Sequence, residues 1–473
     1  MDTSTTPGLH ALFEAQRLAF ARDSFPGRAI RLDRLARLRL LVTANEDAIA
    51  EAISTDFGQR SRHETAIAET VMVLGAISHA RKHLGRWMKT RRVATALHSL
   101  PGASRIMPQP LGVAGIVSPW NYPLQLALGP AVAALAAGNR VLIKPSELTP
   151  SFSALLQQLV ASSFAADECA VVIGDADVGR QFVSLPFDHL LFTGSTAVGR
   201  QVAIAAAANL TPVTLELGGK SPAILDASCD VVDAAGRIAA GKLLNAGQTC
   251  IAPDYVLCPA PLVPAFVDAF TRATARMYPT LERNPDYTSI VNARHRDRLQ
   301  ALVEDARTKG ARVVTIDPAR EPEAPERRKM RPTQLLDVAD GMAVMQEEIF
   351  GPVLPVVAYG SPEEAIAFVN ARPRPLALYW FGKDGRRRDQ VLRDTISGGV
   401  TVNDVLLHIA QENLPFGGVG ASGSGAYHGD YGFRIFSMDK PVFAQSRWSG
   451  TAMLQPPYGP FAERIIGMLK RFA

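Results

Sequence analysis

The stretch Leu111-Gly-Val-Ala-Gly-Ile-Val117 is a short, uncharged, apolar run, as is typical of a strand buried on both faces of a parallel sheet. The Ala- and Leu-rich segment from Pro123 to Gly138 follows it and predicts a buried helix, and Asn139-Arg-Val-Leu-Ile-Lys144 predicts the next strand. A strand, a helix and a strand in this order form a unit with parallel strands and a right-handed crossover. This unit therefore predicts an α/β fold.

The same alternation continues downstream in two series. The first series comprises a helix at 151–164, strands at 170–173 and 188–192, a helix at 197–208 and a strand at 211–217. The second comprises helices at 231–245, 261–276, 292–309, 362–371 and 386–395, and strands at 254–258, 312–315, 353–357 and 376–381. Two such series predict two parallel-sheet α/β domains. Upstream, residues 8–95 show apolar spacings of three and four and predict helices.

Composition excludes several classes of protein. The net charge is +5, but the basic residues are scattered apart from short runs such as 386–388, so we expect no nucleic-acid partner. Four cysteines in 473 residues do not form a disulfide framework, and none has metal-ligand spacing. We therefore expect no metal and a reducing compartment. The polar start Met1–Thr6 lacks the regions of a signal peptide, and no window predicts a membrane-spanning segment. These features favour a cytoplasmic protein.

A thiol and a carboxylate stand out in these domains. Cys250 ends the run Gly247-Gln-Thr-Cys250, whose small and polar residues we expect to turn the backbone and present the sulfur in a cleft. Glu216 lies in the apolar run 215–217, directly before two glycines. A buried carboxylate has a raised pKa and can act as a general base. A thiol that must be activated and a base that can activate it are the two parts of a covalent-catalysis site.

Other polar residues fall at the ends of predicted strands. Asn121, between a strand and a helix, can donate to an oxyanion or cap the helix, and both roles are possible. Gly194, Ser195 and Gly199 open a helix after a strand, where small residues let the backbone approach a phosphate. Lys144 and Glu147 end another strand and suit a ribose and a phosphate. Glu348, in the run 347–352, is a further candidate of this kind.

Seven motifs, taken together, resemble those of the aldehyde dehydrogenase superfamily in order and spacing. They are PWNYP at 119–123, KPSE at 144–147, FTGS at 192–195, LELGGK at 215–220, GQTC at 247–250, EEIFGP at 347–352 and LPFGG at 414–418. The runs at 245–255, 374–379 and 414–429 are similar to the class 3 branch. The ending Met453-Leu-Gln-Pro-Pro-Tyr-Gly459 resembles the bacterial coniferyl aldehyde dehydrogenases of that branch.

The resemblance implies a role for each matching residue. Cys250 would be the nucleophile, Glu216 the general base and Asn121 the oxyanion donor. The residues that would bind the cofactor are Trp120, Lys144, Ser146, Glu147, Gly194, Ser195, Gly199, Leu217, Glu348 and Phe350. A thiolate would attack the aldehyde, hydride would pass to NAD(P)+, and the thioester would be hydrolysed. NAD is the expected cofactor and NADP stays open, because class 3 members accept either.

The resemblance also implies a domain plan and an assembly. The fold would hold a Rossmann-type cofactor domain, a catalytic domain and a small oligomerisation flap, in a homodimer. The expected division is 1–95 for the N-terminal helical part of the cofactor domain, 96–217 for the dinucleotide-binding domain, 218–398 for the catalytic domain, 399–440 for the return to the cofactor domain with the flap, and 441–473 for a tail.

Three alternatives remain at the level of function. The substrate is coniferaldehyde or a related aromatic aldehyde, or else a medium- or long-chain aliphatic aldehyde. Tyr122 and the loop around His408 are candidates to line the pocket mouth, and His408 itself is expected to be structural. A CoA-acylating enzyme would not need the general base Glu216, and a non-catalytic relative would be expected to lack the nucleophile or the base.

Overall fold

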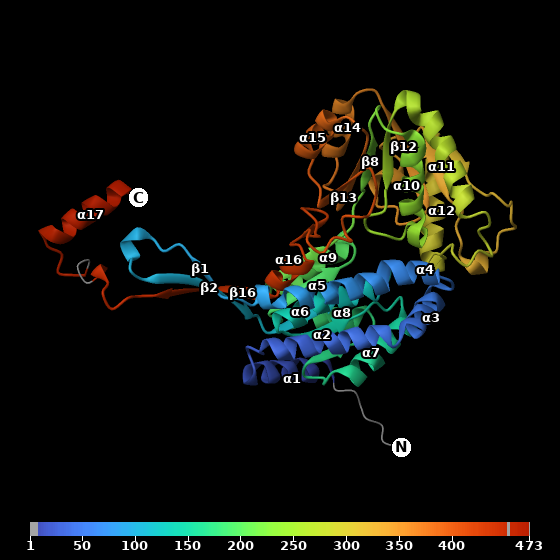
Figure 1. Ribbon diagram of the computed structural model, residues 1–473. Coiled ribbons are helices and arrows are strands. Elements are labelled where there is room, and N and C mark those ends of the chain that lie inside the picture. Colours follow the sequence, from blue (N-terminus) through green and yellow to red (C-terminus); the bar gives the residue numbers. More distant parts are fainter. Residues whose placement is uncertain (1–7, 452–454, 473) are drawn as a thin grey trace, which may run out of the picture.

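The computed structural model describes residues 8–451 and 455–472. Residues 1–7, which hold the polar start, and 452–454, which hold the beginning of the 453–459 motif, lie outside the described residues. The body has two lobes, and a long arm leaves it on one side (Figure 1). In the described ranges no helix combines the length and the apolar character that crossing a membrane requires.

The first lobe is built on a six-stranded sheet in the order β15-β7-β6-β3-β4-β5. The strands β3 to β7 are parallel to their neighbours, and β15 pairs antiparallel with β7. The strand bounds are Val113–Val117 (β3), Arg140–Lys144 (β4), Cys169–Val171 (β5), His189–Thr193 (β6), Val213–Glu216 (β7) and Gly423–Ser424 (β15). The predicted strands of the first series are thus confirmed.

Helices surround this sheet. They are α1 (Leu9–Arg22), α2 (Arg28–Thr43), α3 (Glu46–Phe57), α4 (Arg62–Thr65), the π-helical η1 (Ala66–Thr70), α5 (Val71–Trp87), α6 (Gln125–Ala137), α7 (Pro150–Ser163), α8 (Ala176–Val183), α9 (Thr196–Ala207) and α16 (Gly429–Ile435). α6 is apolar on every side and is buried between the sheet and the helices α2, α5 and α16. The sequence did not predict α8.

The second lobe holds a seven-stranded sheet in the order β10-β11-β12-β9-β8-β13-β14, parallel except at β10. The bounds are Arg312–Thr315 (β10), Thr333–Leu336 (β11), Val353–Tyr359 (β12), Tyr255–Pro259 (β9), Pro222–Leu225 (β8), Ala377–Phe381 (β13) and Gly399–Val402 (β14). The helical segments are α10 (Val231–Leu243), η3 (Leu244–Gly247), η4 (Ala260–Leu262), α11 (Val263–Met277), α12 (Ala293–Thr308), η5 (Pro325–Arg327), α13 (Ala343–Gln346), α14 (Pro362–Asn370) and α15 (Gly385–Asp394). A second parallel α/β sheet was predicted; β8, β11 and β14 were not.

The arm is a three-stranded antiparallel sheet in the order β1-β2-β16. It consists of β1 (Arg91–Val93), the short helix η2 (Leu97–Ser99), β2 (Ala103–Pro110) and β16 (Ser437–Ala444), and the helix α17 (Pro460–Phe472) follows it. The expectation of helix up to residue 95 is wrong after Trp87, where α5 ends, and Arg91–Val93 pair with 104–106 as a strand. Residues 399–440 contribute β14, β15 and the start of β16, one strand to each sheet. The domain boundaries themselves stay a prediction.

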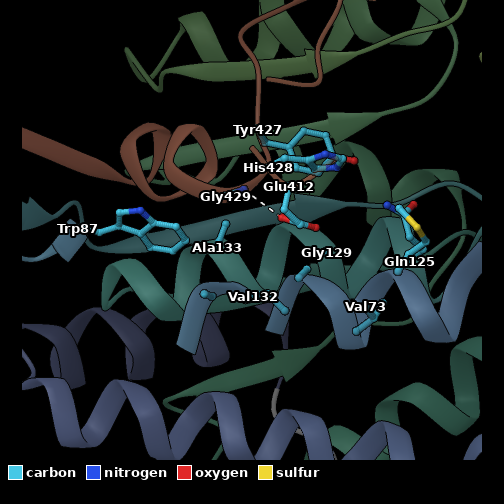
Figure 2. A pocket seen from close by; sticks show the side chains of 13 residues that line it. Val73, Trp87, Gln125, Gly129, Val132, Ala133, Glu412, Tyr427, His428 and Gly429 are labelled. Atoms are coloured by element: carbon cyan, nitrogen blue, oxygen red, sulfur yellow. Dashed lines mark hydrogen bonds between the residues drawn. The ribbon is translucent and has the colours of Figure 1, made fainter. Parts of the chain in front are cut away.

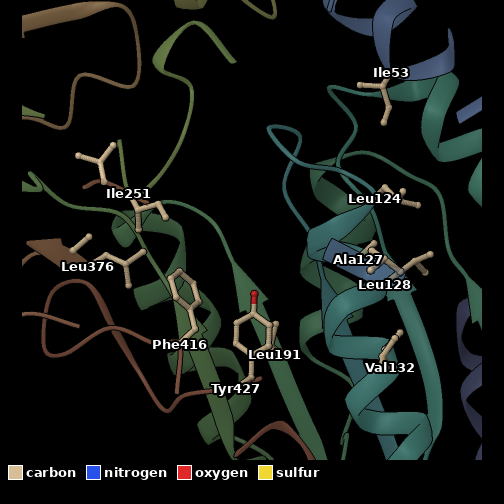
Figure 3. Close-up of a cluster of buried hydrophobic side chains, with 14 of the residues drawn as sticks. Ile53, Leu124, Ala127, Leu128, Val132, Leu191, Ile251, Leu376, Phe416 and Tyr427 are labelled. Carbon is tan, nitrogen blue, oxygen red and sulfur yellow. The ribbon is translucent and has the colours of Figure 1, made fainter. Parts of the chain in front are cut away.

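One large apolar core links the two lobes. It runs from Ile53 through Leu124 and Leu128 of α6 to Ile251, which directly follows Cys250. Figure 3 shows Phe416 and Tyr427 beside Ile251 and Leu376, facing the side chains of α6. Core packing of this kind fixes the loop that carries the thiol to the large apolar core.

Candidate active site

Cys250 ends a turn whose backbone is strained. After α10 the residues Asn245, Ala246 and Gly247 have φ values of 53°, 51° and 77°. A left-handed conformation costs a residue other than glycine about 1–3 kcal/mol, so the surroundings must hold this turn. The side-chain amide of Asn245 does so by donating to the backbone oxygens of Asn121, at 3.0 Å, and Gln248, at 3.1 Å. The sequence predicted a turn in the run 247–250; the left-handed residues lie at 245–247, so the turn begins two residues earlier than predicted.

Gly247 is required in this turn. A Cβ on it would lie 2.3 Å from the backbone oxygen of Gly351, closer than real Cβ atoms come. The backbone N–H of Asn245 also donates to Glu64 Oε2 at 3.1 Å. The thiol loop is thus fastened to α4 and to the segment before β12.

Glu216 is the last residue of β7, between Thr193 of β6 and Gly423 of β15. Its side chain is 2% exposed, and neither carboxylate oxygen has a hydrogen-bond partner among the described residues. Burial raises the pKa of Glu216 well above its ordinary value. A carboxyl group with a raised pKa inside a cavity is a candidate general base.

The thiol is in a similar environment. Burial, and then the negative charges of Glu348 and Glu216, raise the pKa of Cys250 to about 12. At neutral pH the sulfur is therefore protonated in this state and needs a base to become a nucleophile. Burial raises the pKa of Cys169 and Cys258 to about 12 as well, but both are buried in strands and do not line the cavity.

Asn121 lies beside this thiol loop. Its Nδ2 donates to the backbone oxygen of Gln248 at 3.2 Å, which leaves one N–H of the amide for another acceptor. The alternative of a helix cap is wrong, because α6 begins four residues later with Leu124 at the cap position. The carboxylate of Glu69 serves that helix end instead, accepting from the N–H groups of Leu124, at 2.7 Å, and Gln125, at 3.2 Å.

A buried ion pair holds the Asn121 loop from behind. Arg60 Nη1 lies 2.9 Å from Glu69 Oε1, and both side chains are inaccessible to solvent. The same guanidinium donates to the backbone oxygen of Asn121 at 3.0 Å. Tyr122 is buried too and shares a 2.6 Å hydrogen bond with Thr249. Tyr122 therefore supports the thiol loop from within, and the expectation that it lines the pocket mouth is not met.

Cys250, Glu216 and Asn121 all line one cavity of about 240 Å³ between the lobes. The cavity is lined by Pro119, Trp120, Asn121, Leu126, Thr193, Gly194, Ser195, Glu216, Leu217, Gly218, Cys250, His295, Arg298, Glu348, Phe350, Leu376, Phe416 and Tyr427. It shares Trp120, Gly194, Ser195 and His295 with a cleft of about 650 Å³ that continues to Lys144, Ser146 and Glu147. One continuous space thus reaches from the thiol to the end of β4.

The far end of the cleft combines a cation and a carboxylate. Lys144 is buried, and its Nζ lies 3.9 Å from Glu147 Oε2, which is half exposed. Across the cleft, Ser195 caps the first turn of α9 by accepting from the N–H of Val198 at 3.4 Å. Gly199, one turn further on, packs so closely that a Cβ would lie 2.6 Å from Leu217. A helix N-terminus of this kind favours an anionic group.

The middle of the space is bounded by Glu348 and an aromatic group. A Cβ on Gly218 would lie 1.9 Å from Glu348 Oε2, so the carboxylate rests directly on the glycine backbone. Burial, and then the charge of Asp254, raise the pKa of Glu348 to about 8, and its Oε1 has no partner among the described residues. Phe350 has a φ of 53° and meets Trp120 edge to face at 5.4 Å. The residues predicted to bind the cofactor therefore lie along one continuous surface, except for Gly199, which is buried and lines neither cavity.

The sequence reasoning missed His295 and Arg298, which also line the cavity. The ring of His295 lies 5.2 Å from that of Trp120, and Arg298 donates to the backbone oxygen of Glu348 at 3.3 Å. The sequence of their helix, α12, has the charge pattern of a solvent-exposed helix. Only the i, i+3 spacing of His295 and Arg298, which places both on one face, could have indicated that they line a site. His408 is buried and bonds Thr401 at 2.9 Å, and burial lowers its pKa to about 4, as a structural histidine requires.

Residues 10–442 match the sequence model of the aldehyde dehydrogenase family. The chain belongs to the aldehyde dehydrogenase family. The expected family is thus confirmed over nearly the whole chain, and with it the oxidation of aldehydes as the reaction. The thiol of Cys250, the carboxylate of Glu216 and the amide of Asn121 line one cavity of this chain.

Among the proteins to which this chain is similar are coniferyl aldehyde dehydrogenases. A protein from Pseudomonas aeruginosa named probable coniferyl aldehyde dehydrogenase is 51% identical over 458 residues, 97% of this chain and 95% of the relative. The coniferyl aldehyde dehydrogenase of a Pseudomonas species is 50% identical over 443 residues, 93% of this chain and 91% of the relative.

Solved structures agree with the fold. Staphylococcus aureus AldH in its substrate-bound state superimposes with a TM-score of 0.92 at 38% identity, over 98% of this chain and 100% of that one. An indole-3-acetaldehyde dehydrogenase in complex with NAD+ superimposes with a TM-score of 0.84 at 26% identity, over 92% of this chain and 88% of that one. Both have two-lobed aldehyde dehydrogenase folds of the kind predicted from the sequence.

Proposed function

We propose that this chain is an NAD-dependent dehydrogenase of coniferaldehyde or a closely related aromatic aldehyde, which it converts to the carboxylic acid. The observation that carries the proposal is the meeting of Cys250, Glu216 and Asn121 in one cavity that continues into the cleft ending at Lys144. No other described cavity unites a thiol with an unpaired buried carboxylate.

The chemistry begins at the thiol. Glu216 removes the proton of Cys250, and the thiolate attacks the carbonyl carbon to form a C–S bond. The amide of Asn121 and the backbone N–H of Cys250 donate to the oxygen that becomes negative. Loss of hydride from that carbon leaves a thioester. Glu216 first releases the proton of Cys250 to solvent and then takes a proton from water; the water oxygen bonds to the carbon, and the C–S bond breaks to release the acid and the thiolate.

The residues of the cleft fit a nicotinamide dinucleotide. When bound, the cofactor accepts the hydride lost by the substrate carbon. Glu348, whose Oε1 is buried without a partner among the described residues, would hold a ribose hydroxyl. Phe350 and Trp120 would flank the nicotinamide, and the glycine-lined start of α9 would accept the pyrophosphate. Lys144, Ser146 and Glu147 would hold the adenosine ribose.

NAD is the proposed cofactor and NADP the alternative. Glu147 is exposed in the cleft, so a 2′-phosphate next to its carboxylate would meet repulsion that a ribose hydroxyl does not. The test is kcat/KM for both cofactors in the wild type and in Glu147→Gln. We expect NAD to be preferred and the substitution to reduce that preference; equal use of both by the wild type would contradict the proposal.

The substrate rests on the coniferyl aldehyde dehydrogenases to which this chain is similar. The substrate end of the cavity is lined by the aromatic rings of Phe416 and Tyr427 and by the aliphatic side chains of Leu126 and Leu376, and such a lining suits an aromatic substrate ring. The test compares kcat/KM for coniferaldehyde, hexanal and decanal in one buffer. Preference for coniferaldehyde supports the proposal, whereas preference for the alkanals would keep the mechanism and replace the substrate by a fatty aldehyde.

We also propose a homodimer that works in the cytoplasm. Free thiols at all four cysteines suit a reducing compartment. The arm and α17 stand away from the body (Figure 1), and the arm carries exposed apolar side chains such as Val93, Met438 and Phe443. Such a surface is typical of a subunit interface. Light scattering after size-exclusion chromatography distinguishes the dimer from the monomer.

A further inference from the structure

A second, much smaller cavity lies behind the active site, between α5, α6 and the segments around residues 412 and 428. Its volume is about 20 Å³. A site for one water molecule needs about 10–15 Å³ and at least two polar partners. Gln125, Glu412, Tyr427 and His428 supply polar groups to its lining. The cavity therefore has the size and the chemistry to hold a single water.

Tyr427 separates the two cavities and lines both of them. Its hydroxyl is buried and makes no well-formed hydrogen bond among the described residues. Burial, followed by the negative charges of Glu216 and Cys250, raises the pKa of Tyr427 well above its ordinary value. The phenol is thus neutral at every working pH, and Tyr427 and Glu216 line the same active-site cavity.

Glu412 lies on the other side of the small cavity, next to solvent. Its Oε2 accepts from the N–H of Gly429 at 3.2 Å, its side chain is partly exposed, and its neighbours Gln411 and Asn413 are exposed. In Figure 2 the carboxylate lies between Tyr427 and His428 on one side and α6 on the other.

The other groups that face Glu412 carry no fixed charge. Burial lowers the pKa of His428 to about 4, and its Nδ1 has no partner in the described part of the chain. His79 of α5 approaches from the same side, since its Nε2 is 3.1 Å from where a Cβ on Gly429 would be. Burial also lowers the pKa of His79. Gln125 of α6 is neutral. Glu412 is thus the group of this lining that can carry a proton to solvent.

Resting on the proposed role of Glu216, we propose that Tyr427, a water in this cavity and Glu412 form the path by which the proton taken by Glu216 leaves the enzyme. During hydrolysis a proton of the attacking water goes to Glu216, and the C–S bond breaks. The acid then passes its proton to the Tyr427 oxygen while the phenol proton moves to the cavity water. The water gives a proton to the Glu412 carboxylate, which releases it to solvent. No electron is transferred along the path.

The path has a physical reason. Glu216 is 2% exposed, and an acyl group on Cys250 would occupy the cavity that both residues line. A base that stays protonated cannot take part in the next turnover. A rear path would restore the carboxylate while the front is closed.

The test uses three variants of the full chain. Glu412→Gln removes the acceptor, and Tyr427→Phe removes the hydroxyl. Gly129→Ala adds a methyl group to the lining of the small cavity, where its only contact would be Gln125 Nε2 at 3.8 Å. Because Gly129 is inside α6, alanine there favours folding. The control is Glu326→Gln, the same chemical change at an exposed residue outside both cavities.

The measurement follows NADH by absorbance and released protons with an indicator dye, in rapid mixing with the preferred aldehyde. We expect a burst of NADH in the three variants, with proton release delayed and steady-state turnover reduced by about tenfold or more, since one positioned proton transfer is worth 10²–10⁴-fold. The control should match the wild type.

Two results have different meanings. Wild-type turnover and proton release in Glu412→Gln and Gly129→Ala would overturn the path while leaving the thiol mechanism intact. A wild type that forms no NADH from any of the aldehydes, or NADH formation that is unchanged in Cys250→Ala, would instead overturn the proposed function.

Discussion

Cys250 differs from the other cysteines by its position rather than by its titration. Cys250→Ala should lower kcat/KM by about 10⁴-fold or more, since removal of a nucleophile abolishes the covalent route. Cys258→Ala, within β9, is the matched control and should change activity little. Alkylation followed by mass spectrometry checks the same point, with Cys250 labelled and protected by cofactor and aldehyde. Labelling spread over all four thiols would contradict the assignment.

Glu216 predicts the pH dependence of turnover. Only its carboxylate form can take a proton, and burial raises its pKa. The fraction of active base therefore falls as the pH drops, and the acid limb of kcat should lie well above the ordinary carboxyl value of about 4.3.

Glu216→Gln should remove this limb and lower turnover by about 10²–10⁴-fold. A profile that keeps its acid limb in Glu216→Gln would assign the limb to another group.

At the scale of single residues, the sequence predicted the site where a short motif also determines the local backbone conformation. The turn before Cys250 and the glycines after Glu216 could be predicted because polar and glycine residues follow an apolar helix in the first case and an apolar strand in the second. His295 and Arg298 could not, because α12 alternates basic and acidic residues like any solvated helix. Only the packing of α12 against Trp120 distinguishes its inner face.

At the scale of elements, the buried pair Arg60–Glu69 joins η1 to the start of α6. Glu69→Gln should lower the free energy of unfolding by about 3–5 kcal/mol, because it leaves the Arg60 charge buried without its partner. Urea denaturation measures this difference. Asp268→Asn, which breaks the exposed pair with Arg272 within α11, should cost less than about 1 kcal/mol. Equal losses in both variants would show that burial of the pair is not decisive.

The predicted elements that proved correct have local signals. The run 113–117 is continuous and apolar, and α6 is long and rich in alanine. The strands of the arm lack such a signal, because β2 contains two prolines and half-exposed side chains. Its partner β16 is more than 300 residues away in the chain. β8 and β14 have only four residues each and become strands through their neighbours in the sheet.

At the scale of the molecule, the exposed apolar side chains of the arm lead us to expect that the arm forms the interface of the proposed homodimer. Lysine at Val93, Met438 and Phe443, all exposed and apolar, should convert the proposed homodimer to a folded monomer, because charged groups at a buried interface lose their solvation. Light scattering gives the mass, and circular dichroism confirms that the fold is kept. A lysine triple variant at the exposed polar positions Arg276, Arg294 and Glu326 is the control. A dimer that survives the arm substitutions would locate the interface elsewhere.

The core that extends from α6 to Ile251 also sets how the enzyme fails on heating. Side chains from both lobes pack into this single core. Neither lobe can therefore unfold and leave the other intact. The calorimetric and van't Hoff enthalpies should agree, and activity and helical ellipticity should vanish at one temperature. In the cell, a heat-damaged molecule would therefore unfold completely and be degraded by proteases. It would not persist as a partly folded, inactive enzyme that still binds cofactor.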